Sequence, residues 1–80
     1  MTLKPIVTEK AVMLIEIDNI LTFETDKNKT KEQIKEEFEE IFNSKVEKIR
    51  TLVKKSKKYA YIKLKKEFPA IDIATKLGLM

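Results

Sequence analysis

The short polar run Lys54–Lys58 limits the possible folds most, because it joins two segments that both resemble β-strands. A run of this length is long enough for a hairpin and too short for the crossover that parallel neighbouring strands need. The segment before it, residues 46–53, alternates imperfectly, which indicates a β-bulge. The segment after it alternates cleanly, with Ala60, Ile62 and Leu64 on one face and Tyr59, Tyr61, Lys63 and Lys65 on the other. These segments are therefore predicted to be antiparallel neighbours.

A helix is predicted immediately before this pair of strands. Residues 30–33 read Thr-Lys-Glu-Gln, a capping box in which the Thr hydroxyl and the Gln amide each satisfy a backbone N–H. One apolar stripe follows at helical spacing, formed by Ile34, Phe38, Ile41 and Phe42. Five glutamates surround the stripe, and paired carboxylates of this kind occur in acid–base and metal sites. A solvated helix face is the favoured interpretation, because nothing in the sequence would draw these side chains inward.

The remaining elements follow from caps and turns. Pro5 has no N–H group, so a strand over Leu3–Val7 belongs at a sheet edge. Thr8 is a suitable N-cap for the next segment, and Pro69 begins a final helix that Gly78 ends. The other predicted elements are a helix over Glu9–Glu16, a turn at Asp18-Asn19 and a strand over Ile20–Thr25.

The resulting order is β-α-β-α-β-β-α, which predicts an α+β fold. A helix between two strands implies a right-handed crossover, and placing the last strand between the two crossover strands gives a split βαβ, ferredoxin-like arrangement. The predicted four-stranded sheet is antiparallel or mixed, has the order 1-2-4-3 and is packed with helices. No repeat or linker interrupts the chain, so residues 1–80 are expected to form a single domain.

Composition excludes several classes of function. The chain contains neither His nor Cys and has one Gly, so we expect no disulfide, no metal site, no glycine-rich cofactor loop and no enzyme activity. No apolar run approaches the roughly 20 residues of a membrane span. The first eight residues also lack the apolar segment of a signal peptide.

Charge is distributed unevenly along the chain. The formal net charge is +4, yet Lys45–Lys66 carries ten Lys or Arg residues against a single acid, Glu47. Two tyrosines lie inside this basic segment. Lysine and arginine release condensed counterions when they contact phosphates, so a basic segment with aromatic residues favours a nucleic-acid partner. A solvated charged face is the alternative interpretation.

Three stretches of the chain resemble one family, the universal large-ribosomal-subunit protein numbered twenty-three. Pro5-Ile-Val-Thr-Glu-Lys-Ala11 resembles its N-terminal signature. Thr30-Lys-x-x-Ile-Lys35, with Phe42-x-x-Lys-Val46 and Thr51-Leu52, resembles its helix-to-strand segment. Tyr59-Ala-Tyr-Ile-Lys-Leu64 and Ile73-Ala-x-x-Leu-Gly-Leu79 resemble the last strand and C-terminal helix of archaeal members. The resemblance covers nearly the whole chain.

The chain departs from the family pattern at two places. Arg50 stands where the family usually has Asn, which replaces a backbone-bonding amide with a candidate phosphate contact. Bacterial members carry a long basic extension between the last two strands, whereas this chain has only Lys54–Lys58. The short turn resembles the archaeal form, and no tunnel-lining role is inferred for it.

The resemblance implies a non-catalytic, cytoplasmic protein on the ribosome that binds large-subunit rRNA near the polypeptide exit tunnel, beside neighbouring subunit proteins. It also implies a docking surface for nascent-chain factors, with Glu9 as the contact and the signal recognition particle as the candidate partner. No cofactor, membrane span or small-molecule substrate is expected. The candidate rRNA-binding residues are Lys4, Thr8, Lys10, Lys31, Arg50, Thr51, Lys54, Lys55, Lys57, Lys58, Tyr59, Tyr61 and Lys63.

Two other interpretations remain open from the residues alone. A free-standing RNA-binding or regulatory ferredoxin-like module would share the fold. Such a module should carry aromatic pairs on its central strands, and only Tyr59 and Tyr61 approach that pattern. A homodimeric small-molecule sensor would need a Gly-containing ligand loop, which the sequence lacks. The two tyrosines themselves either contact RNA or pack on a half-buried sheet face.

Overall fold

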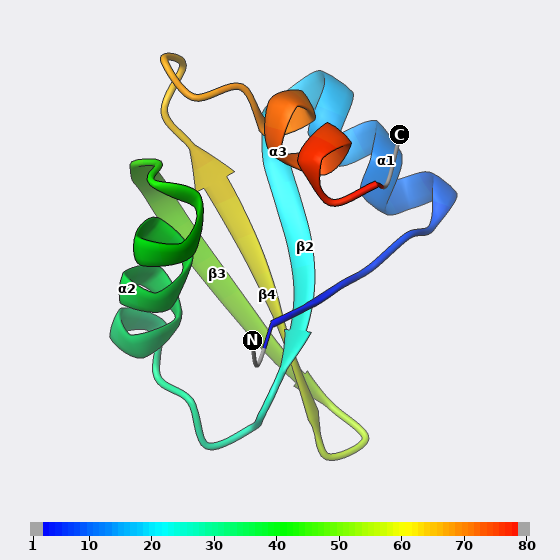
Figure 1. The fold of residues 1–80 in the computed structure, drawn as a ribbon. Helices are drawn as coiled ribbons and strands as arrows, with labels where there is room; N and C mark the ends of the chain where they lie inside the picture. The colour runs from blue at the N-terminus through cyan, green and yellow to red at the C-terminus, as the bar shows by residue number, and fades with distance from the viewer. Residues whose placement is uncertain (1–2, 79–80) are drawn as a thin grey trace.

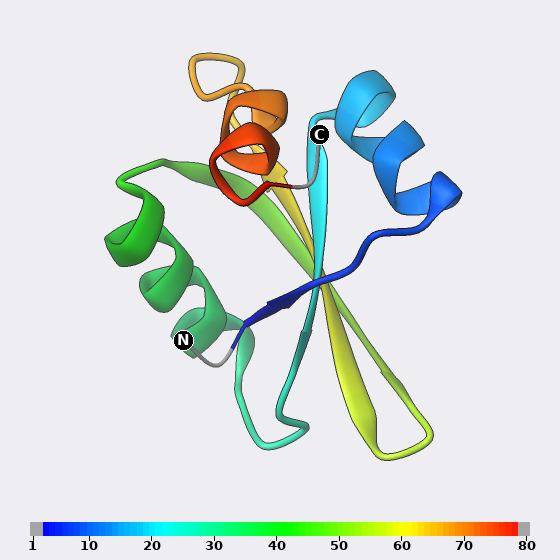
Figure 2. The same ribbon diagram turned by 45° about the vertical axis from the view of Figure 1, so that its right-hand side comes forward.

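The strand that comes last in the sequence lies inside the sheet, and helices lie at one end of the sheet and on both sides of its central strands (Figures 1 and 2). The structure is a computed structural model that describes residues 3–78. Its elements are β1 (Lys4–Pro5), α1 (Glu9–Asp18), β2 (Ile20–Thr25), α2 (Lys31–Phe42), β3 (Val46–Lys54), β4 (Lys57–Leu64) and α3 (Ala70–Lys76). The four strands lie in the order β1-β2-β4-β3, and every adjacent pair is antiparallel. The predicted α+β fold and strand order are confirmed.

The split βαβ unit consists of β2, α2 and β3. Because both strands are antiparallel to β4, they run parallel to one another with β4 between them. The other helix-connected pair, β1 and β2, is antiparallel and is not a parallel crossover. Pro5 lies in β1 at the sheet edge, where its missing N–H removes no hydrogen bond to a second neighbour.

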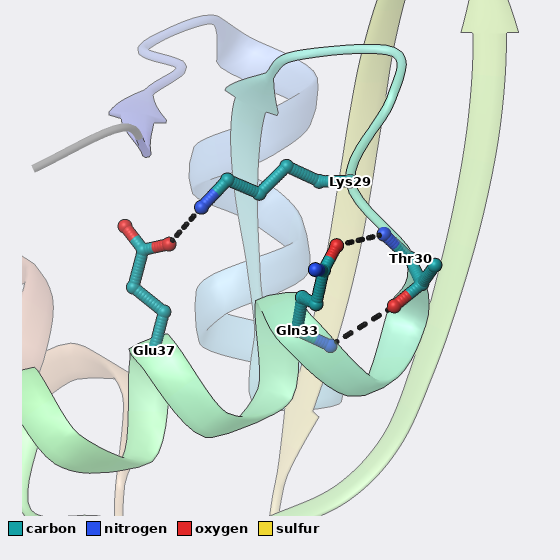
Figure 3. A network of polar contacts seen from close by, with 4 residues as sticks. All are labelled: Lys29, Thr30, Gln33 and Glu37. Carbon is teal, nitrogen blue, oxygen red and sulfur yellow. Dashed lines mark hydrogen bonds and ion pairs between the residues drawn. The ribbon is translucent and has the colours of Figure 1, made fainter.

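Both longer helices begin at the predicted caps. Thr8 accepts a hydrogen bond from the backbone N–H of Ala11, 3.1 Å away. At the start of α2, the Thr30 hydroxyl accepts from the Gln33 N–H, and the Gln33 side chain accepts from the Thr30 N–H (Figure 3). The loop before this cap is held by an ion pair of 2.8 Å between Lys29 and Glu37 (Figure 3). The capping box is therefore confirmed in full.

The core lies between the sheet and the helices. Phe23 and Phe38 are fully buried and meet edge to face with ring centroids 5.8 Å apart, and Phe42 packs against both. Ile41, predicted on the same stripe, is exposed because it lies at the stripe's edge in the last turn of α2. The α3 residues Ala70, Ile73 and Ala74 close the core at the other end.

Asn19 joins four elements at this end of the molecule. Its backbone is left-handed, with φ of 58°, which ends α1 and lets β2 begin. Its side-chain amide donates to the carbonyl oxygens of Leu64 and Phe68 and accepts from the Ala70 N–H. The predicted turn thus also fixes the end of β4 and the start of α3.

The hairpin differs from the predicted turn at Lys54–Lys58. Lys54 pairs with Lys57, so the loop consists only of Lys55 and Ser56. Both loop residues have positive φ, 51° and 66°, as a type I′ turn requires. The prediction was too long because neither residue is one of the Asn or Gly residues that normally mark such a turn. The predicted bulge in β3 is confirmed by a register shift between Val46 and Lys48.

We expect Asn19→Ala to lower the free energy of unfolding by about 2–3 kcal/mol. It places a side chain without local hydrogen bonds at positive φ and removes the hydrogen bonds of the amide with four backbone groups. Asn19→Gly keeps the backbone conformation, so it should lose about 1 kcal/mol less. Urea unfolding of the three chains measures both differences, and equal stability of all three would contradict this role.

Replacing the turn residues should stabilise the hairpin. The double variant Lys55→Asn with Ser56→Gly suits the left-handed conformations, so its free energy of unfolding should rise by roughly 0.5–2 kcal/mol. Denaturant unfolding tests this against Lys35→Asn, an exposed substitution on α2 that should bring no gain. A double variant less stable than the parent would show that the turn has a different requirement.

Candidate nucleic-acid interface

The sheet has one apolar face and one charged face. In β4, Ala60, Ile62 and Leu64 are buried against the helices, so the alternate residues Tyr59, Tyr61 and Lys63 lie on the opposite side. Pairing with the two neighbours extends this charged side across the sheet, and we call it the open face. It consists of Ile20, Thr22, Glu24, Lys48, Arg50, Leu52, Lys54, Lys57, Tyr59, Tyr61 and Lys63.

Cross-strand pairing arranges the open face in rows. Tyr61 lies between Thr22 on β2 and Arg50 on β3, so a tyrosine and an arginine occupy neighbouring positions on the same side of the sheet. The next row toward the hairpin tip places Tyr59 between Glu24 and Leu52. Such rows bring flat apolar surface and fixed positive charge to the same place, which suits a partner with both phosphates and bases.

Lysines face lysines across two rungs of the hairpin. Lys48 is opposite Lys63, and Lys54 is opposite Lys57 beside the turn. Like charges directly opposite one another destabilise an antiparallel pair. An arrangement that costs the free chain stability is expected where a polyanionic partner compensates for it. The hairpin tip projects beyond the three helices, where such a partner has access (Figures 1 and 2).

Helix α1 borders the open face and forms a groove with it. Figure 2 shows α1 and α2 on opposite sides of the central strands. Two hollows of about 430 and 610 Å³ lie between α1 and the open face, and they share Lys10, Leu14, Leu52 and Tyr61 in their walls. We call the two hollows together the α1 groove. One wall comes from α1 and the other from β3 and β4, which lie far from α1 in the sequence and which only the fold brings beside it.

Most of the candidate rRNA-binding residues lie on this surface. Lys4 is beside it, in a separate hollow with Glu24 and Lys57, and Thr8 lines the groove while capping α1. Thr51 faces the helices along β3 but also borders the second hollow. Besides Thr8 and Thr51, the candidates that the open face or the groove brings together are Lys10, Arg50, Lys54, Lys55, Lys57, Tyr59, Tyr61 and Lys63.

Two candidates lie elsewhere. Lys58 lies on the helix side of β4, and its ammonium group donates a hydrogen bond to the carbonyl oxygen of Lys29. It therefore holds the loop before α2, a role that the alternation of β4 dictates. Lys31 is exposed in the first turn of α2 and borders a hollow with Glu47 and Lys48 at the outer edge of β3. Neither residue lies in the α1 groove.

The structure adds residues that the sequence reasoning did not select. Lys48 joins the open face because it lies two residues before Arg50, beyond the bulge that separates it from Val46. The even-numbered pattern of β3 was a usable signal for it. Thr22, Leu14 and Leu52 complete the groove. No local sequence pattern marks them, because their positions depend on the packing of α1 beside β2.

Acidic groups at this surface are few and placed at its ends. Glu24 forms an ion pair of 3.3 Å with Lys57 near the hairpin tip. Lys57 is largely exposed, so this pair contributes little to stability. Asp18 borders the second hollow at the far end of α1. The centre of the open face, around Tyr61 and Arg50, is therefore positive.

Other chemistry has little support in the described part of the chain. Within residues 3–78, no group of three or more acidic side chains is placed to hold a metal ion. The α2 carboxylates instead serve the fold, since Glu39 accepts a hydrogen bond of 2.9 Å from the Val46 N–H. In the same residues, no helix has the length and apolar character needed to cross a membrane.

The candidate docking residue, Glu9, is exposed in the first turn of α1.

Comparison with known proteins identifies the family of the chain. The sequence model of the family described as "Ribosomal protein L23" matches residues 1–71. The large ribosomal subunit protein uL23 of Pyrobaculum aerophilum is 47% identical over 76 residues, which cover 94% of each chain. The family consists of ribosomal structural proteins and is not an enzyme family. Leu79, in the last stretch of the predicted resemblance, lies outside the described residues. The chain therefore belongs to the ribosomal protein L23 family, and it is a ribosomal protein located on the ribosome in the cytoplasm.

Proposed function

We propose that residues 1–80 act as a single rRNA-binding domain of the large ribosomal subunit, near the polypeptide exit tunnel. The open face and the hairpin tip form the RNA-binding surface. The observation that carries this proposal is the row of Thr22, Tyr61 and Arg50, flanked by the opposed lysines of the hairpin. Family membership supports the large subunit as the place of action, since the relative from Pyrobaculum aerophilum carries that name.

The chemistry of the open face fits folded RNA. Arg50 presents a fork of N–H donors that matches the geometry of a phosphate, whereas the lysines act as mobile point charges. Folded RNA is recognised largely by its shape, its phosphates and its 2′-hydroxyls, so the surface needs no base-reading motif. Between six and eight such contacts would make binding fall by orders of magnitude from roughly 50 to 200 mM salt.

We further propose that the start of α1 is a docking surface for proteins outside the tunnel, with the signal recognition particle as the candidate. Glu9 is exposed there, and the apolar side chains of Val7, Met13 and Ile17 are 58%, 56% and 69% exposed on or beside the same helix. Several large apolar side chains exposed on one element are typical of a surface that meets another protein. Helix-end stabilisation by Glu9 is compatible with this role.

A free-standing RNA-binding module is the second candidate. It would use the same open face, and the positions of Tyr59 and Tyr61 on the central strand β4 favour it. Family membership favours the ribosomal role. Sedimentation with large subunits after a high-salt wash separates the two, because a stable subunit component stays with the particle and a free-standing module does not.

Lys48→Glu should stabilise the free chain and weaken RNA binding. The new carboxylate would face Lys63, so the free energy of unfolding should rise by about 0.2–1 kcal/mol. Binding to the chain's own large-subunit rRNA should weaken at least tenfold, and the slope of log affinity against log salt should fall by roughly one.

The matched control for this experiment is Lys76→Glu on the exposed surface of α3. It makes the same change in net charge away from the open face, so its effect on RNA affinity should be much smaller. Equal losses for the two variants would mean that overall charge, and not the open face, determines binding.

Glu9→Arg should weaken recruitment of the signal recognition particle to ribosomes without displacing the chain from the subunit. The free chain should lose less than about 1 kcal/mol of stability, since only the favourable charge at the helix start is lost. Glu16→Arg, nearer the other end of α1, is the control. Wild-type recruitment by ribosomes carrying Glu9→Arg would exclude the docking role.

A further inference from the structure

The floor of the α1 groove contains a polar group without a partner. Thr22 is only 8% exposed, and its hydroxyl has no hydrogen-bond partner among the described residues. The residue lines the hollow of about 430 Å³ and lies directly opposite Tyr61 on β4. A buried hydroxyl without a partner is unfavourable unless something binds it. Rotation about χ1 exchanges this hydroxyl with the methyl group of the same side chain.

The groove is lined like a site for a flat ligand. Tyr59 and Tyr61 supply aromatic surface on one wall, and Ala11 and Leu14 supply apolar surface on the α1 wall. A volume of about 430 Å³ lies within the range of roughly 300–1,000 Å³ that proteins use for small ligands. The ligand therefore has an apolar, planar part that enters and at least one polar edge that reaches Thr22.

Positive charge lies on both rims of the groove. Lys10 projects from α1, and Lys54, Lys55 and Lys57 lie on the hairpin across from it. A ligand that enters between them would present negative charge on either side of its planar part. A nucleotide within an RNA strand has this form, because its base is flanked by a phosphate at each end.

We propose that the α1 groove binds one unpaired nucleotide of the rRNA, with its base against the two tyrosines and a polar edge hydrogen-bonded to the Thr22 hydroxyl. Paired bases are stacked inside the helix, so they cannot reach the floor of the groove, whereas bulged or looped bases can. This inference rests on the proposed function, since it specifies which part of the RNA the groove takes.

The experiment compares RNA hairpins with the same stem, each closed by a non-nucleotide linker so that no loop base is offered. One hairpin is fully paired, and four others carry a single bulged nucleotide, one for each base. Wild-type chain should bind one or more bulged hairpins several-fold more tightly than the paired one at the same salt concentration. Thr22→Val keeps the shape but removes the hydroxyl, and it should reduce this preference roughly three- to tenfold, the loss of one hydrogen bond.

Thr25→Val is the matched control. Thr25 is also buried, and its hydroxyl also lacks a partner among the described residues, but it lies outside the α1 groove. This variant should keep the wild-type preference. Equal affinity of the wild type for paired and bulged hairpins, or a preference that Thr22→Val leaves intact, would overturn the proposal. Failure to bind the hairpins and the large-subunit rRNA would instead overturn the proposed function.

Discussion

The register of β4 between its two neighbours is the constraint on which the other features depend. Its alternate residues place Ala60, Ile62 and Leu64 in the core and the two tyrosines on the open face. A slip by one residue would exchange these faces and bury charged groups, so the hydrophobic core fixes the register strongly. The bond from the Leu64 N–H to the Asn19 carbonyl and the side-chain bonds of Asn19 hold one end of this strand. The same pairing that builds the core therefore also aligns Thr22, Tyr61 and Arg50.

The free chain gives up stability at the hairpin. Lysines face lysines on two rungs, and Lys55 and Ser56 occupy left-handed positions that Asn and Gly would suit better. The core compensates for this with a cluster of three phenylalanines and with helices capped by Thr8 and Thr30. The stable part of the domain thus carries a strand pair whose charge arrangement becomes favourable beside RNA.

Much of the fold was predictable because its signals are local. The capping box at Thr30, the edge position of Pro5 and the alternation of β4 each depend on a few neighbouring residues, and all three were confirmed. The turn was predicted too long because Lys55 and Ser56 carry no turn signal, and the pairing of Lys54 with Lys57 becomes visible only in the sheet. The position of Thr22 in the groove depends on long-range packing, because α1 must lie beside β2. The basic and aromatic residues of the sequence therefore identify the open face. They do not identify the floor of the α1 groove, which forms only where α1 packs beside β2 and β4.

In the proposed complex with RNA, the open face, and not the helix side, lies against the nucleic acid of the subunit. Lysine acetylation of the free chain and of intact large subunits, read by mass spectrometry for each lysine, tests it most directly. If the open face lies against RNA, Lys10, Lys48, Lys54 and Lys63 lose reactivity in the subunit, while Lys35 and Lys76 on the helices stay reactive. Protection of the helix lysines with an open face as reactive as in the free chain would contradict this arrangement.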